Sequence, residues 1–255
     1  MRIVAPSAAL APFVRQFMLV EVRDTTVRLR LPEPGLVLGV RYRGLASVLD
    51  ADAEVLLPQV TLAGLTNTAR RMRTGAGGGV LLASFHPGGA APFFSHPLHE
   101  FFGATIALEQ VLPRREVARV HAQVGEAASD RERVAALEAY LLARLRPPKT
   151  DPLVAAALHA INEAQGALQI RPLARKLGIS QDPLEKRFRR AVGASPKQFA
   201  SLLRLRHAID AYRPGASLTQ LALAAGYFDQ SHFNRELRAV TGQPPGRFFQ
   251  AGEHH

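Results

Sequence analysis

Basic side chains are concentrated in one short stretch of this sequence, between residues 171 and 206. The stretch holds ten Lys and Arg residues against only Asp182 and Glu185, a net charge of +8 in a chain whose total is +11. Such a density of cationic groups is suited to binding phosphates, and nucleic acid is the usual partner. A solvated helical face would carry the same charge. Charge alone therefore leaves both interpretations open.

Residues for covalent or metal chemistry are sparse by comparison. The chain has no Cys, which excludes disulfides, thiolate nucleophiles and cysteine zinc sites. His96 and His99 have a spacing that can share a metal on a helix, but Pro97 lies between them and no third ligand is evident. The common nucleophile-elbow, phosphate-loop, zinc-helix and dinucleotide motifs are also missing. We therefore expect no catalytic residue, no metal and no cofactor.

The segment around His86 is the candidate for a ligand pocket. His86 precedes Pro87-Gly88-Gly89 and, a few residues later, the aromatic pair Phe93 and Phe94. Proline and glycine more often form a turn, and apolar aromatic residues more often belong to a core. We favour that interpretation and keep His86, Phe93 and Phe94 as the alternative, a small-molecule site.

The first part of the chain has the pattern of short strands separated by turns. Runs of apolar and β-branched residues predict strands at residues 17–22, 27–31, 36–43, 55–57 and 80–85. Prolines and the glycine-rich residues 75–79 separate these runs.

Helical spacing begins at Pro113 and continues to Arg146, with Val134, Leu137, Leu141 and Leu145 on one stripe. Pro147 and Pro148 then interrupt it. We predict a multi-domain α+β chain in three parts. These are a β-rich N-terminal domain with trailing helices over residues 1–145, a linker over 146–152 and an all-α domain over 153–250.

An internal repeat organises the all-α part. Leu173-Ala174 recurs as Leu221-Ala222 at an offset of 48, whereas Ser180, Phe188 and Gly193 recur as Asp229, Leu237 and Gly242 at an offset of 49. One residue inserted in a turn explains the change of offset, because turns accept insertions that helices do not.

Each copy reads as a short helix, a glycine turn and a second, capped helix. The second helices are expected over residues 181–192 and 230–240, with Ser180 and Asp229 as their N-caps. Leu184, Phe188 and Val192, and in the other copy Phe233, Leu237 and Val240, are spaced to anchor them. This is the helix-turn-helix arrangement, in which the second helix enters the major groove of DNA. A long helix over residues 196–212 would join the two units.

At this point the sequence resembles the AraC/XylS family of bacterial regulators over about residues 151–249. The matching residues are Leu173-Ala174, Leu177–Ser180, Leu184–Arg189 and Ser195-Pro196-Lys197 in the first copy, and Leu221-Ala222, Ala225–Glu236 and Thr241–Pro245 in the second. Residues 85–98 are similar to a less characterised N-terminal domain of AraC-like proteins, and this match is weaker than the C-terminal one.

The resemblance implies which side chains meet DNA. Base contacts fall on Asp182, Glu185, Lys186, Gln230, Ser231 and Arg235. Carboxylates can accept from cytosine, Lys and Arg can donate to guanine, and Gln can pair with adenine. Phosphate contacts fall on Arg187, Arg189, Arg190, Lys197 and Arg238.

The expected function is a sequence-specific transcription regulator that binds a promoter or operator in double-stranded DNA, and not an enzyme. The family usually adds a sensing or dimerising domain, so a small-molecule effector and a homodimer are further hypotheses. No apolar run of about 18 residues exists for a membrane span, and we expect a cytoplasmic protein. Two alternatives stay open: a non-specific architectural DNA-binding protein, and an enzyme with a DNA-targeting module. His254 and His255 receive no function.

Overall fold

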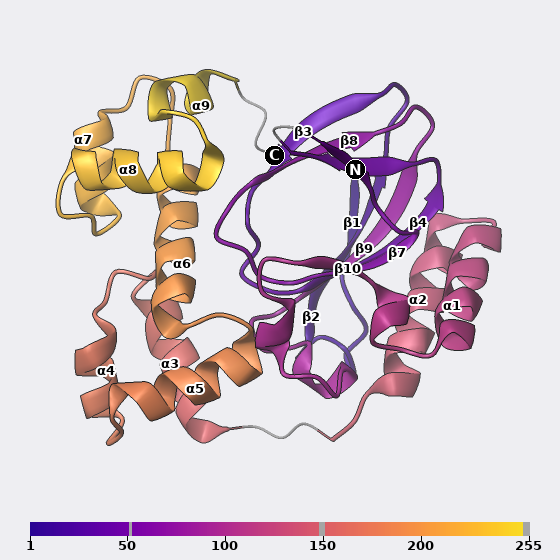
Figure 1. Cartoon of the computed structure of the whole chain (residues 1–255), viewed down its shortest axis with the longest axis horizontal. Coiled ribbons are helices and arrows are strands. Elements are labelled where there is room, and N and C mark those ends of the chain that lie inside the picture. The colour runs from indigo at the N-terminus through magenta and orange to yellow at the C-terminus, as the bar shows by residue number, and fades with distance from the viewer. Residues whose placement is uncertain (51–52, 148–150, 252–255) are drawn as a thin grey trace.

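The computed structural model describes residues 1–50, 53–147 and 151–251. Two antiparallel sheets fill the N-terminal part and curve around a common interior, and the helices of the C-terminal part lie to one side of them (Figure 1). The fold expected from sequence, a β-rich part followed by an all-α part, is confirmed. Residues 148–150 of the predicted linker, and His254 and His255, lie outside the described residues.

The larger sheet has the strand order β1-β2-β9-β4-β7-β10, and the smaller sheet has the order β3-β8-β5-β6. The larger sheet comprises β1 Arg2–Val4, β2 Val14–Glu21, β9 Gly79–Phe85, β4 Val37–Arg43, β7 Val60–Ala63 and β10 Thr105–Ala107. The smaller sheet comprises β3 Thr26–Arg30, β8 Arg70–Thr74, β5 Ala46–Leu49 and β6 Glu54–Leu56. All five strands expected from the sequence are present, with shifted ends, and β1, β5, β7, β8 and β10 were not predicted.

The helical segment expected over residues 113–146 is two helices, α1 Arg114–Glu126 and α2 Asp130–Arg144. The break follows from capping. The Ser129 side chain accepts a hydrogen bond from the Glu132 backbone N–H, and the Glu132 carboxylate accepts one from Ala128 N–H at 2.9 Å. This reciprocal capping starts a new helix at Asp130.

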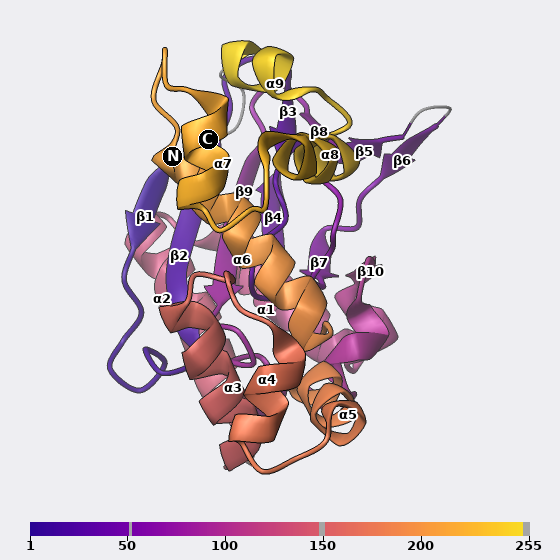
Figure 2. The same ribbon diagram turned by 90° about the vertical axis from the view of Figure 1, so that its left-hand side faces the viewer.

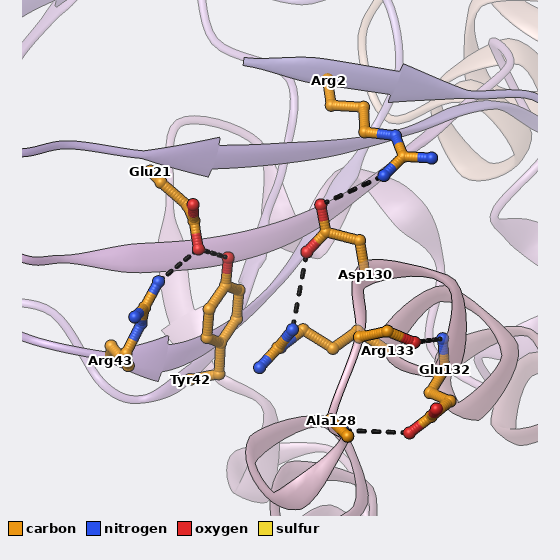
Figure 3. A network of polar contacts seen from close by, with 9 residues as sticks. Arg2, Glu21, Tyr42, Arg43, Ala128, Asp130, Glu132 and Arg133 are labelled. Atoms are coloured by element: carbon orange, nitrogen blue, oxygen red, sulfur yellow. Dashed lines mark hydrogen bonds and ion pairs between the residues drawn. The ribbon is translucent and has the colours of Figure 1, made fainter.

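Polar contacts attach α2 to the strands. Asp130 lies 3.5 Å from Arg2 on β1 and 3.5 Å from Arg133, and the Arg133 guanidinium stacks over the Tyr42 ring (Figure 3). The Tyr42 hydroxyl donates to Glu21 at 3.0 Å. Burial and the Glu21 carboxylate together raise the pKa of Tyr42 to about 12.

The C-terminal part is built around α6 Pro196–Ala211, the long helix expected between the two units. Helices α3 Pro152–Glu163, α4 Ile170–Lys176 and α5 Gln181–Val192 lie at one end of α6. Helices α7 Leu218–Ala224, α8 Gln230–Thr241 and α9 Pro245–Ala251 lie at the other (Figure 1).

The hydrophobic core continues from the sheets into the first helical unit. One cluster of buried side chains runs from the strands through α1 and α2 to Leu184, Phe188 and Val192 of α5 and Phe199 of α6. A second, smaller cluster lies between the far half of α6 and helices α7 to α9, and Leu29 and Leu31 of the N-terminal part pack against it. The N-terminal part therefore contacts both helical units.

Candidate DNA-binding surface

The two helical units have the same local geometry, as the repeat predicts. Gly178 and Gly226 both adopt left-handed backbone conformations, with φ of +69° and +80°. The next residue of each turn donates from its backbone N–H to an equivalent carbonyl: Ile179 to Ala174 at 3.1 Å and Tyr227 to Ala222 at 3.0 Å. Both units are thus a helix, a glycine turn and a second helix.

The caps of the two second helices differ. Asp229 accepts a 2.6 Å hydrogen bond from the His232 N–H, as expected. Ser180 makes no capping bond through its side chain, contrary to expectation. The position that would donate from the first turn of α5 is Pro183, which has no N–H.

The anchoring residues are buried with one exception. Leu184, Phe188 and Val192 anchor α5, and Phe233 and Leu237 anchor α8. Val240 was expected to complete the second set, but Thr241 is buried in its place and Val240 is only partly buried. The Thr241 hydroxyl donates to the Leu237 carbonyl at 2.8 Å, which satisfies it inside the helix.

Helices α5 and α8 run in nearly the same direction. Both cross the page in Figure 1 and are seen nearly end-on in Figure 2. Their C-terminal ends face the β-rich part: Gly193, just after α5, lies against Leu98 and Leu65, and Ala69 N–H donates to Val240 O at 2.7 Å. Their N-terminal ends therefore point away from it, toward solvent.

The base-contact residues expected from sequence lie on the exposed sides of these helices. Asp182, Lys186, Ser231 and Arg235 are exposed, and Glu185 and Gln230 are half-buried. The Glu185 carboxylate accepts hydrogen bonds from Arg189 at 2.7 and 3.1 Å, and the Gln230 side-chain oxygen accepts one from Thr219 at 2.6 Å. These bonds do not use the second carboxylate oxygen of Glu185 or the side-chain NH2 of Gln230, so either group can meet a base.

The expected phosphate contacts are all exposed, but they do not form one group. Arg187 lies 3.4 Å from Asp151, and Arg189 pairs with Glu185. Arg190 and Arg238 form no ion pair with any other described residue. Lys197 sits at the start of α6, where it lines a cavity between the two parts of the chain. Its role as a phosphate contact remains a prediction.

A polar cluster that sequence reasoning did not identify fixes α8 to α6. Glu236 accepts from Arg204 at 2.8 Å and from the Ser201 hydroxyl at 2.7 Å, and Arg204 stacks over the ring of Tyr227. Burial acts to lower the pKa of Arg204, but Glu236 and Tyr227 together outweigh it and the pKa is raised. Burial also raises the pKa of Tyr227. The orientation of α8 relative to α6 thus depends on a partly buried ion pair.

Phe93 and Phe94, two of the three residues kept as an alternative small-molecule site, pack in the core of the N-terminal part. Phe93 is buried with its ring 5.8 Å from that of Phe13 and 5.4 Å from that of Phe85, and Phe94 contacts Phe101. His86 is half-buried and donates from its backbone to Phe13. A pocket there remains a prediction. Among the described residues no three His, Asp or Glu side chains lie close enough to hold a metal ion.

A cavity of 260 Å³ lies where the β-rich part meets α6 and α8. Pro32 and Asn67 line one side, and Leu202, Leu205 and Val240 line the other. Beside it, Arg206 of α6 donates to the Pro32 carbonyl at 2.8 Å and lies 3.6 Å from Glu33, which also pairs with Arg15 at 2.7 Å. These contacts join the N-terminal part to the helix that carries both units.

Two helix-turn-helix units on one connecting helix define a DNA-binding domain. A family model described as a helix-turn-helix domain matches residues 173–251, and the C-terminal part is a helix-turn-helix domain of the AraC type, as the resemblance predicts. A second model, described as a domain of unknown function (DUF6597), matches residues 2–107. A search of curated proteins finds no match.

Solved structures of regulators are similar at low sequence identity. ToxT from Vibrio cholerae is 11% identical, with a TM-score of 0.49, over 92% of this chain and 96% of that one. The xylose-binding transcription activator xylR is 22% identical, with a TM-score of 0.34, over 47% and 38% of the two chains. The AraC-like transcriptional activator CuxR is 14% identical, with a TM-score of 0.26, over 88% and 90%. In none of the described helices is there an apolar stretch long enough to span a bilayer.

Proposed function

We propose that this protein is a sequence-specific transcription regulator that reads two adjacent major-groove half-sites and is controlled by a signal acting on its N-terminal part. The observation that carries the proposal is the pair of second helices, α5 and α8, which run in similar directions and have exposed residues at their N-terminal ends. Two such helices on one face of DNA would lie about 34 Å apart, one helical turn. A small-molecule effector and a homodimer belong to the proposal as further hypotheses.

The first prediction separates base reading from phosphate binding. Fragments bound by the wild-type chain are selected from genomic DNA, and the best site is titrated against scrambled DNA at two salt concentrations. Arg235→Ala should weaken the best site about 10- to 100-fold and relax selection at one base pair, because a guanine contact is lost. Arg190 is also an exposed arginine and lies on α5, the second helix of the first unit. Arg190→Ala should weaken binding to all DNA sequences alike and reduce the slope of log affinity against log salt concentration by about 1.

Equal binding of selected and scrambled DNA would contradict the proposal and favour the architectural alternative. A regulator should prefer its site by about 10³-fold or more.

The second prediction concerns how the N-terminal part acts on the DNA-binding units. Arg206→Met keeps the apolar stem on α6 but removes the bonds to Pro32 and Glu33. We expect affinity for a complete two-half-site operator to fall about three- to tenfold, because one hydrogen bond and one partly buried ion pair are lost. Affinity for a single half-site should not change. Arg28→Met, the same change at an exposed arginine of β3 that makes neither of these bonds, is the control. An equal loss of affinity for the complete operator and for the single half-site in Arg206→Met would contradict the prediction.

A further inference from the structure

The ring of Phe228 is the most exposed large apolar side chain among the described residues, with 88% of its surface open to solvent. It directly precedes Asp229, the N-cap of α8, so it stands at the entrance of the second recognition helix. Its neighbours along the helix, Gln230 and Ser231, are two of the expected base contacts.

The repeat shows that Phe228 is the inserted residue. In the first unit one residue, Ile179, separates the turn glycine from the cap Ser180, whereas Tyr227 and Phe228 separate Gly226 from Asp229. The equivalent backbone hydrogen bonds of Ile179 and Tyr227 identify these two as counterparts. Phe228 therefore has no counterpart, and the first unit closes the same turn without it.

A packing role inside the protein does not explain the exposed ring of Phe228 either. A residue just before an N-cap commonly packs against the residue four positions into the helix, here Phe233. Tyr227 occupies that place: it is buried, and its ring lies 5.3 Å from that of Phe233. Phe228 is left facing solvent.

We propose that Phe228 contacts thymine methyl groups in the major groove and adds sequence preference to the second half-site. The inference rests on the proposed function. Early residues of a recognition helix meet base edges, and the thymine 5-methyl is the apolar group that the major groove presents, with Phe among the side chains that contact it. A single ring among Asp229, Gln230 and Ser231 fits that groove better than it fits an extended apolar protein interface, which needs several such side chains.

The test uses the full chain and the operator selected with the wild-type protein. Each thymine of both half-sites is replaced in turn by uracil, which removes only the methyl group. Binding is measured for the wild type, Phe228→Ala and Leu223→Ala; Leu223 is a second exposed apolar residue of this unit but lies on α7. We expect one or two uracil positions in one half-site to weaken the wild type and Leu223→Ala about fourfold, the factor for burying one methyl group. Phe228→Ala should not respond to them.

Three results would overturn the inference while the proposed function stands: unchanged binding by Phe228→Ala, equal uracil effects on wild type and Phe228→Ala, or a loss in Phe228→Ala that is independent of the methyl groups. Unchanged binding would leave a protein partner as the reason for the exposed ring. In each case Arg235→Ala still relaxes base selection. If the wild type itself prefers no sequence, the proposed function fails and the inference fails with it.

Discussion

Gly166→Ala should destabilise the protein by at least about 4 kcal/mol. Gly166 follows α3 with φ of +79°, and a Cβ added there would lie 2.0 Å from the carbonyl oxygen of Ala200 and 2.8 Å from the backbone nitrogen of Arg204, both on α6. Backbone atoms of a helix cannot move aside as a side chain can. The measurement is the midpoint of urea unfolding at unchanged slope.

Gly215→Ala is the matched control for this change. Gly215 has φ of +84° but no heavy atom near the position of the added Cβ, so only the left-handed conformation is penalised, by about 1–2 kcal/mol. Equal losses for the two variants would mean that the close approach of the α3–α4 turn to α6 is absent in solution.

Phe188→Ala should cost about 3–5 kcal/mol and should loosen the sheets as well as the helices. Phe188 is fully buried on α5, with its ring 5.7 Å from that of Phe199, in the cluster that also contains Leu81, Ala83 and Phe85 of β9. This cluster spans both parts of the chain, so a cavity in it should loosen both. Native-state hydrogen exchange should therefore show faster exchange of the β9 amides together with those of α5.

Phe228→Ala provides the comparison, because the same atoms are removed from an exposed position and stability should change by less than about 0.5 kcal/mol. If Phe188→Ala accelerates exchange in the helices alone, the continuous core is not a single cooperative unit.

The helices of the C-terminal part could be predicted from sequence because their signals are local. Helix α5 has the predicted ends, and α8 differs from its prediction by one residue, since glycine turns and caps mark their limits. The strand β8 could not be found in this way. Its sequence, Arg70–Thr74, has no apolar alternation, and its pairing with β3 and β5 comes from backbone hydrogen bonds between distant segments.

The site was predicted in part. The repeat located the second helix of each unit and its exposed face, and the change of offset indicated one inserted residue in a turn. Exposure of Phe228, the pairing of Glu185 with Arg189 and the contact of Ala69 with Val240 required the folded chain. The last is a main-chain bond, for which the side chains at either end give no signal.

The connecting helix α6 has a consequence for the DNA itself. Its 16 residues form a rod about 24 Å long, one end of which lies in the core shared with the sheets and the other in the separate core of the second unit. For a DNA-binding protein built this way, the length of the connecting helix fixes the rotational position of one half-site relative to the other around the DNA. A few base pairs inserted between the half-sites would turn one of them to the far side of the double helix, where a stiff rod cannot follow.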